Sequence, residues 1–279
     1  MELTSVTKKI KFSVLMSVYK KDNPFFFREA LYSVIHQTYS ADEIILVKDG
    51  AVSKEIQLVI DDVKKQCKYL YVYELKENVG LGKALSYGMQ KCRNEIIARM
   101  DSDDISLPER FEKEIAYFGK NKNLTIVGSY IDEFVENPNK PKSIRTVPTS
   151  MEEIKRKVVV RCPFNHPSVM FKKSHILAAG GYQSLYLFED YYLWIRLIEK
   201  EFICANIPEV LVHMRIGNGM VSRRGGKEYF ESYKFLQNYM LKHKMLPIWK
   251  YMFNLIVRWS VQVGMSDRMR EVVYRRILR

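Results

Sequence analysis

The sequence predicts an α/β protein, in which helices flank a mainly parallel central sheet and a C-terminal helical extension follows. Over the first hundred residues, apolar runs rich in β-branched residues alternate with segments of helical periodicity. Short connections join them, and this alternation is typical of a parallel sheet wrapped by helices. Beyond about residue 226 the pattern is entirely helical. We therefore expect a main domain over 1–225 and a basic amphipathic helical tail over 226–279.

Each predicted element has its own signal. Continuous apolar runs predict strands at 11–19, 42–50, 70–75, 95–101, 124–134 and 202–215. Apolar residues at helical spacing predict helices at 24–39, 54–67, 81–92, 151–160 and 189–200. Pro24 suits a first helical turn, and Asp49 with Gly50 marks a turn at the end of a strand.

The composition is that of a folded globular chain, because 47% of its 279 residues are hydrophobic and 28% are charged. No C-x-x-C pair occurs, so we expect reduced thiols in a cytoplasmic protein at Cys67, Cys92, Cys162 and Cys204. The N-terminus has no apolar core of signal-peptide length, and no uncharged apolar stretch of about 18 residues occurs. The sequence favours a protein that is soluble or lies on a surface.

The charge balance indicates an anionic partner. The formal net charge is +13, which suits a nucleotide-like substrate, a nucleic acid or an acidic membrane face. Residues 242–279 hold nine basic and two acidic residues, and Trp249, Phe253 and Trp259 lie on a broad apolar face of the same segment. Two alternatives stay open: the tail packs on the main domain, or it anchors the protein to an anionic membrane surface.

Three carboxylates follow the fourth predicted strand. Asp101, Asp103 and Asp104 stand where the ligand-binding edge of a parallel sheet is expected. A solvated turn is the interpretation that spacing alone favours. However, close carboxylates repel unless a cation lies between them, and Mg²⁺ or Mn²⁺ prefers carboxylate, phosphate and water oxygens. At this edge of the sheet we favour a site for a divalent cation.

Other polar residues are expected at the same edge. Asp49 could accept hydrogen bonds from a base or ribose, although an Asp-Gly turn needs no ligand. The segment 78–85, NVGLGKAL, lacks the third glycine of a dinucleotide site and predicts a turn before a helix. Glu189 and Asp190 fall in a first helical turn, where the helix dipole stabilises acids; such a carboxylate could instead act as a general base.

Taken together, these segments resemble the family 2 inverting glycosyltransferases of the GT-A fold, of the type that builds bacterial surface polysaccharides. The resemblance covers about residues 11–224. Seven segments appear in the family's order: FSVLMSVYKKD, SVIHQTYSADEIILVKDG, NVGLGKALSYGM, IIARMDSDDISLPERFEK, HPSVMF, GGYQ and FEDYYLWIRL. It is their succession that makes the resemblance specific.

The resemblance implies a role for individual residues. The nucleotide would be bound by Ser17, Tyr19, Asp49 and Asp101. Asp103 would hold a Mn²⁺ or Mg²⁺ ion that bridges the diphosphate, and Asp190 would be the catalytic base, with support from Asp104 and Glu189. The family pattern says little about three arginines after the last strand, which could hold the diphosphate or be solvated: Arg215, Arg223 and Arg224.

The implied reaction moves one sugar from a nucleotide diphosphosugar, expected to be a UDP-sugar, to a saccharide acceptor with inversion. The chain reads KDGA, with Lys48 and Ala51, where many relatives read DDGS, which leaves the base preference open. Leu255 replaces the glutamine of the Q-x-x-R-W signature of processive members, so we expect a non-processive hexosyltransferase. A polyprenyl-diphosphate-linked acceptor would place it peripherally on the cytoplasmic face of the inner membrane.

Other functions fit less well. A nucleic-acid-binding or membrane-binding protein without transferase activity would suit the charge, but no recognised nucleic-acid motif is present, so we expect no nucleic-acid partner. A sugar-phosphate nucleotidyltransferase would need a glycine-rich loop where SVYKKDN stands. An inactive transferase-like scaffold is disfavoured because Asp103 and Asp190 are both present.

Overall fold

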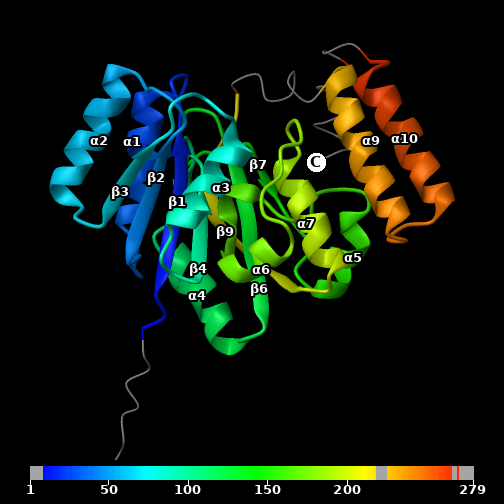
Figure 1. The fold of residues 1–279 in the computed structure, drawn as a ribbon, viewed down its shortest axis with the longest axis horizontal. Helices are drawn as coiled ribbons and strands as arrows, with labels where there is room; N and C mark the ends of the chain where they lie inside the picture. Colours follow the sequence, from blue (N-terminus) through cyan, green and yellow to red (C-terminus); the bar gives the residue numbers. More distant parts are fainter. Residues whose placement is uncertain (1–8, 218–224, 266–268, 270–279) are drawn as a thin grey trace, which may run out of the picture.

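The structure is a computed structural model that describes residues 9–217, 225–265 and 269 (Figure 1). Within these residues, the strands of one nine-stranded sheet are β1 (Phe12–Val18), β2 (Glu43–Lys48), β3 (Leu70–Glu74), β4 (Ile96–Met100), β5 (Ile105–Ser106), β6 (Leu124–Phe134), β7 (Ser143–Arg145), β8 (Met170–Lys172) and β9 (Ile203–Arg215). The α-helices are α1 (Pro24–Ile35), α2 (Lys54–Gln66), α3 (Leu81–Lys91), α4 (Arg110–Lys120), α5 (Met151–Val158), α6 (Lys173–Ala178), α7 (Glu189–Glu199), α9 (Lys227–Lys242) and α10 (Ile248–Gln262).

The sheet has the order β3-β2-β1-β4-β8-β6-β9-β5, and β7 pairs with β6. Strands β1 to β4 pair in parallel, and so do β6 and β9, whereas β8 is antiparallel to both β4 and β6. The predicted α/β architecture with a mainly parallel sheet is confirmed. Strands β5, β7 and β8 have only two or three residues each, too few for a periodic signal.

Both faces of the sheet are buried, which explains the unbroken apolar runs. Val14 and Met16 of β1 pack in one hydrophobic cluster with residues of α1, α2 and α4. Leu15, between them in sequence, packs in a second cluster with residues of α3, α5 and α7. Each face of the sheet therefore carries its own layer of helices (Figure 1).

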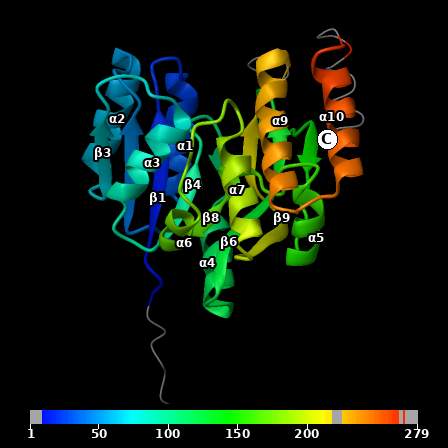
Figure 2. The ribbon, with the colours of Figure 1, turned by 45° about the vertical axis from the view of Figure 1, so that its right-hand side comes forward.

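Helices α9 and α10 lie side by side at one end of the molecule, beyond α7 (Figure 2). The buried side chains of α9, among them Tyr233, Leu236 and Met240, belong to the same hydrophobic cluster as α7. Among the described residues, no helix combines the length and the apolar character that crossing a bilayer requires. The division of the chain at residue 225 stays a prediction.

Helix α3 packs so closely on the sheet that one position has no room for a side chain. A Cβ atom added to Gly88 would lie 2.5 Å from Leu15 Cδ1 and 2.6 Å from Val47 Cγ2. We expect Gly88→Ala to lower the free energy of unfolding by ~1–3 kcal/mol, because the added methyl group forces β1 and β2 side chains out of their packing. Urea unfolding followed by circular dichroism measures this change.

Gly119 provides a matched control in another helix. It is exposed in α4, and a Cβ atom there would meet only Ile10 Cδ1, at 3.8 Å. Gly119→Ala should leave the free energy of unfolding unchanged or raise it by up to ~1 kcal/mol, since alanine favours the helix. Equal effects of the two substitutions would contradict the close packing of α3.

Candidate active site

A cavity of about 2480 Å³ lies at the carboxyl ends of β1, β2 and β4. Every predicted site residue within the described ranges lines it: Ser17, Tyr19, Asp49, Asp101, Asp103, Asp104, Glu189, Asp190 and Arg215. The expected convergence at one edge of the sheet is therefore observed. Arg223 and Arg224 lie outside the described residues.

Asp49 holds the loop that precedes α3. Its carboxylate accepts hydrogen bonds from the side-chain amide of Asn78 (2.9 Å) and from the backbone N–H groups of Val79 (2.8 Å) and Gly80 (3.0 Å). The backbones approach closely here, since a Cβ atom on Gly50 would lie 2.8 Å from Asn78 N. The predicted turn at 78–80 is thus built on Asp49, which faces the cavity from beneath that turn.

Asp22, which the sequence analysis missed, also lines the cavity. Its carboxylate accepts hydrogen bonds from Tyr19 N (3.1 Å) and Ser102 Oγ (2.8 Å), so it ties the loop after β1 to the loop after β4. Burial raises its pKa to about 6, and the charge of Asp101 adds to this. Asn23, the N-cap of α1, fixes the chain beside it. The available signal was its place in the loop directly after the first strand.

Arg99, a second residue that the sequence analysis passed over, lies beneath the acidic segment. It is 1% exposed, and both of its terminal nitrogens bond the carboxylate of Asp101. A bidentate pair of this kind fixes the direction of the carboxylate as well as offsetting its charge. An arginine inside a buried apolar strand is itself a signal, since such a charge needs a partner.

Asp103 and Asp104 differ in exposure. Asp103 is half-buried; burial, Asp101 and Asp22 raise its pKa to about 6. Asp104 is buried, and burial together with the charges of Asp101 and Asp103 raises its pKa well above the usual value. Asp104 accepts a hydrogen bond from Arg215 N at 2.8 Å, so it links the acidic loop to the end of β9.

Arg215, the last residue of β9, holds the acidic loop through its side chain. Its Nε donates to the backbone oxygen of Asp103 (3.1 Å), and its terminal nitrogen lies 2.8 Å from a Glu29 carboxylate oxygen. The guanidinium also lies over the rings of Phe26 and Phe134. These contacts favour a positioning role for Arg215 over the predicted contact with a diphosphate.

Glu189 and Asp190 begin α7 and line the same cavity. Gly82 allows α3 to approach them, because a Cβ atom there would lie 3.3 Å from Glu189 Cβ. Burial and the neighbouring charge of Asp190 raise the pKa of Glu189 to about 7. A carboxyl group with a pKa near neutrality beside a second acid suits acid–base chemistry.

His166 completes the wall near Arg99. Its Nε2 lies 3.0 Å from the Tyr182 hydroxyl, and its ring meets Trp194 of α7 edge to face. Burial and the positive charge of Arg99 lower its pKa well below the usual value, so the imidazole is neutral. The segments HPSVMF and GGYQ thus meet beside the acids at the start of α7.

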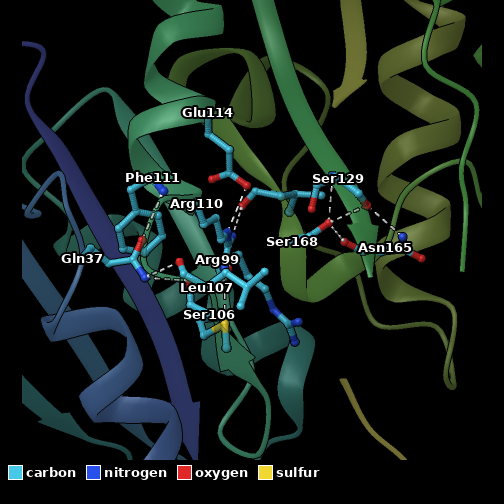
Figure 3. Close-up of polar contacts among 12 residues, drawn as sticks. Gln37, Arg99, Ser106, Leu107, Arg110, Phe111, Glu114, Ser129, Asn165 and Ser168 are labelled. Carbon is cyan, nitrogen blue, oxygen red and sulfur yellow. Dashed lines mark hydrogen bonds and ion pairs between the residues drawn. The ribbon is translucent and has the colours of Figure 1, made fainter. Parts of the chain in front are cut away.

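A buried polar network holds the acidic loop in place (Figure 3). Arg110 pairs with Glu114 (2.9 Å) and donates to the backbone oxygen of Arg99 (2.9 Å). Gln37 donates to Ser106 Oγ (3.1 Å) and to the Leu107 backbone oxygen (2.8 Å), which fixes the far end of the loop. The network therefore fastens both ends of the segment that carries the three aspartates.

The carboxylates suit a hard divalent cation. Within the described ranges, no group of three or more His, Cys, Asp or Glu side chains could hold an ion by itself. Mg²⁺ and Mn²⁺ bind in many proteins through one or two carboxylates, and phosphate and water supply the remaining oxygens. Half-buried Asp103, with its raised pKa and two acidic neighbours, fits such a partial site, because a cation would relieve the repulsion.

The chain has clear relatives. The model of the glycosyl transferase family 2 matches residues 13–177. An Escherichia coli UDP-Gal:alpha-D-GlcNAc-diphosphoundecaprenol beta-1,3-galactosyltransferase is 37% identical over 271 residues, which cover 96% of this chain and 97% of the relative. The amylovoran biosynthesis glycosyltransferase AmsE of Erwinia amylovora is 39% identical over 231 residues, 83% of this chain and 85% of AmsE.

A solved structure supports the fold. S. aureus TarS 1–349, in complex with UDP-GlcNAc, superimposes with a TM-score of 0.68 at 15% identity, over 97% of this chain and 76% of that chain. The predicted GT-A fold is confirmed.

The Arg110–Glu114 pair allows a test of the network. Both side chains are fully buried, and burial raises the pKa of Glu114 to about 7 although Arg110 opposes this. We expect Arg110→Met to lower the free energy of unfolding by ~3–5 kcal/mol, because it leaves a buried acid without its cation. In the double variant with Glu114→Leu, much of that loss should be recovered. A double variant no more stable than the single one, in urea unfolding, would refute this account.

Proposed function

Since the chain belongs to glycosyl transferase family 2, we propose that it transfers one hexose from a UDP-sugar to a saccharide on a polyprenyl diphosphate, with inversion at the anomeric carbon. The observation that carries the proposal is that Asp49, Asp103 and Asp190, far apart in sequence, line one cavity. The activity named for the E. coli relative, which covers nearly the whole chain, supports a lipid-linked acceptor.

In this proposal, the loops after β1, β2 and β4 bind the nucleotide. Asp101, held by Arg99, accepts hydrogen bonds from the ribose, and Asp49 accepts one from the base. Ser17 and Tyr19 form the adjoining wall. Asp22 steadies this wall through its bonds to Tyr19 and Ser102.

Asp103 is the residue proposed to hold Mn²⁺ or Mg²⁺ beside the diphosphate. When bound, the ion supplies positive charge where the departing diphosphate becomes more negative. Asp104 and Arg215 keep the Asp103 backbone in place through the contacts described above.

Asp190 is the proposed general base. Its carboxylate takes the proton from an acceptor hydroxyl as the hydroxyl oxygen forms a bond to the anomeric carbon. The bond between that carbon and the diphosphate oxygen breaks on the opposite side, and the nucleoside diphosphate leaves. A single displacement of this kind inverts the anomeric carbon. Glu189, whose pKa is raised to about 7 by burial and by Asp190, stands beside the base as a second titratable carboxyl group.

We infer one transfer per binding event, and a peripheral position on the cytoplasmic face of the inner membrane. The single transfer is inferred from Leu255, which stands in place of the glutamine found in processive members. Leu255 lies in α10 and packs against the hydrophobic core. The division into a catalytic part, 1–225, and a helical part, 226–279, belongs to the same proposal.

The proposal is tested by a transfer assay with Asp190→Asn. We expect turnover from UDP-galactose to GlcNAc-diphosphoundecaprenol to fall ~10²–10⁴-fold, because an amide cannot take the proton. Binding of UDP-galactose, measured by calorimetry, should change little, since Asp190 faces the acceptor in this mechanism. A panel of other UDP-sugars covers the case in which the donor is a different hexose.

Asp61→Asn is the matched control for the charge change. Asp61 is exposed in α2, away from the cavity. Its substitution should leave turnover unchanged. Near-normal turnover in Asp190→Asn would remove Asp190 from the role of base, and absence of transfer from every UDP-sugar would overturn the proposed donor class.

Removal of the metal provides a separate prediction. Excess chelator should abolish transfer by the wild-type enzyme, and added Mn²⁺ should restore it. In Asp103→Ala, Mn²⁺ should restore little activity at any concentration, because the carboxylate that holds the ion is gone. Full wild-type activity in chelator would contradict the metal assignment.

A further inference from the structure

Helix α10 turns its apolar side away from the protein. Six side chains that recur with helical periodicity are 41–69% exposed: Trp249, Met252, Phe253, Ile256, Trp259 and Val263. This spacing places them on one stripe of the helix. We call this stripe the outer face of α10.

The opposite side of α10, where it packs on the protein, carries polar residues beside the apolar Leu255 and Val261. Asn254 and Gln262 are buried, and the Asn254 amide donates to the Val159 backbone oxygen (2.9 Å) and to Gln237 Oε1 (3.0 Å). The Tyr251 hydroxyl donates to Asn238 of α9 at 2.8 Å. A helix on the surface of a globular protein normally buries its apolar stripe. This orientation is therefore unfavourable in water unless the outer face meets an apolar phase.

The charges near the outer face indicate which apolar phase it meets. Residues 242–265 contain Lys242, Lys244 and Lys250 and no carboxylate, whereas Arg258 of the same segment lies on the inner side of α10, over the Tyr233 ring. Cations beside exposed tryptophans suit the boundary between anionic headgroups and acyl chains. A second copy of the chain would instead bring two sets of positive charge together, which repel.

The position of α10 relates this surface to the cavity. Helices α9 and α10 form one end of the molecule, with α10 outermost (Figure 2). Arg258 of α10 and Tyr229 of α9 both line the cavity. Helix α10 therefore borders the cavity with its inner side and presents the outer face on its other side.

We propose that the outer face of α10 docks on an anionic lipid bilayer and lies in its interface. The docking is argued from the exposed apolar residues of α10 and the charges of residues 242–265. That docking presents a lipid-linked acceptor to the cavity is a further step, which rests on the proposed function. Hydrogen bonds join α10 to α9, while Trp249, Phe253 and Trp259 lie on the outer face.

The test uses the full chain, vesicles of phosphatidylglycerol and phosphatidylethanolamine, and neither donor nor acceptor. We expect Phe253→Ser/Ile256→Ser to lower the partition coefficient in vesicle flotation at least ~tenfold, since two large apolar side chains leave the interface. Vesicles of phosphatidylcholine alone should bind the wild-type protein more weakly. Both substituted residues are exposed, so thermal unfolding should show little change.

Leu58→Ser/Leu177→Ser is the matched control, because these leucines are 67% and 49% exposed on α2 and α6. It should bind vesicles like the wild type, and so should Asp190→Asn, which separates this proposal from the proposed function. Equal binding by the α10 variant would overturn the docking surface. A lipid-free dimer that the α10 variant dissociates, detected by light scattering, would assign the face to a second copy instead.

Discussion

The repulsion between carboxylates gathered at one edge of the sheet is the constraint on which the site depends. Asp22, Asp101, Asp103 and Asp104 approach from two loops, and only Asp101 has a bidentate cation of its own. Burial and the charge of Asp101 raise the pKa of Asp22 to about 6, and burial with the charges of Asp101 and Asp22 does the same for Asp103. Folding thus stores an unfavourable interaction there, which a bound cation would relieve.

The rest of the molecule can be understood as the means of holding these acids in place. Arg110, with Glu114 and Gln37, fastens the loop from the sheet side, and Arg215 fastens it from the end of β9. Burying polar groups costs free energy unless they form hydrogen bonds. A network of such bonds is satisfied in one loop conformation, so it selects that conformation. The proposed substrate contacts therefore need little rearrangement of the protein.

The sequence predicted most of the sheet and its ligand-binding edge. Long apolar runs that alternate with helices indicate a parallel sheet, and the carboxyl ends of parallel strands lie at one edge. For the same reason it predicted that Asp49 and the acidic loop face one site, and both line one cavity. It missed Asp22 and Arg99, whose importance depends on which side chains lie opposite them. It also left the tail unresolved, since apolar periodicity in α10 does not say which side of the helix faces the protein; the buried Asn254 does.

Under the proposed function, the hydrogen bonds that Asp49 already accepts limit which nucleobases can face it. An ionised carboxylate can only accept hydrogen bonds, and its oxygens already receive two backbone N–H groups and one amide. A ring nitrogen that faces it must therefore carry a hydrogen, as in uracil or guanine, whereas the bare N3 of cytosine would set two lone pairs against each other. Asp49, which holds the turn at 78–80, would then also discriminate between uracil and cytosine.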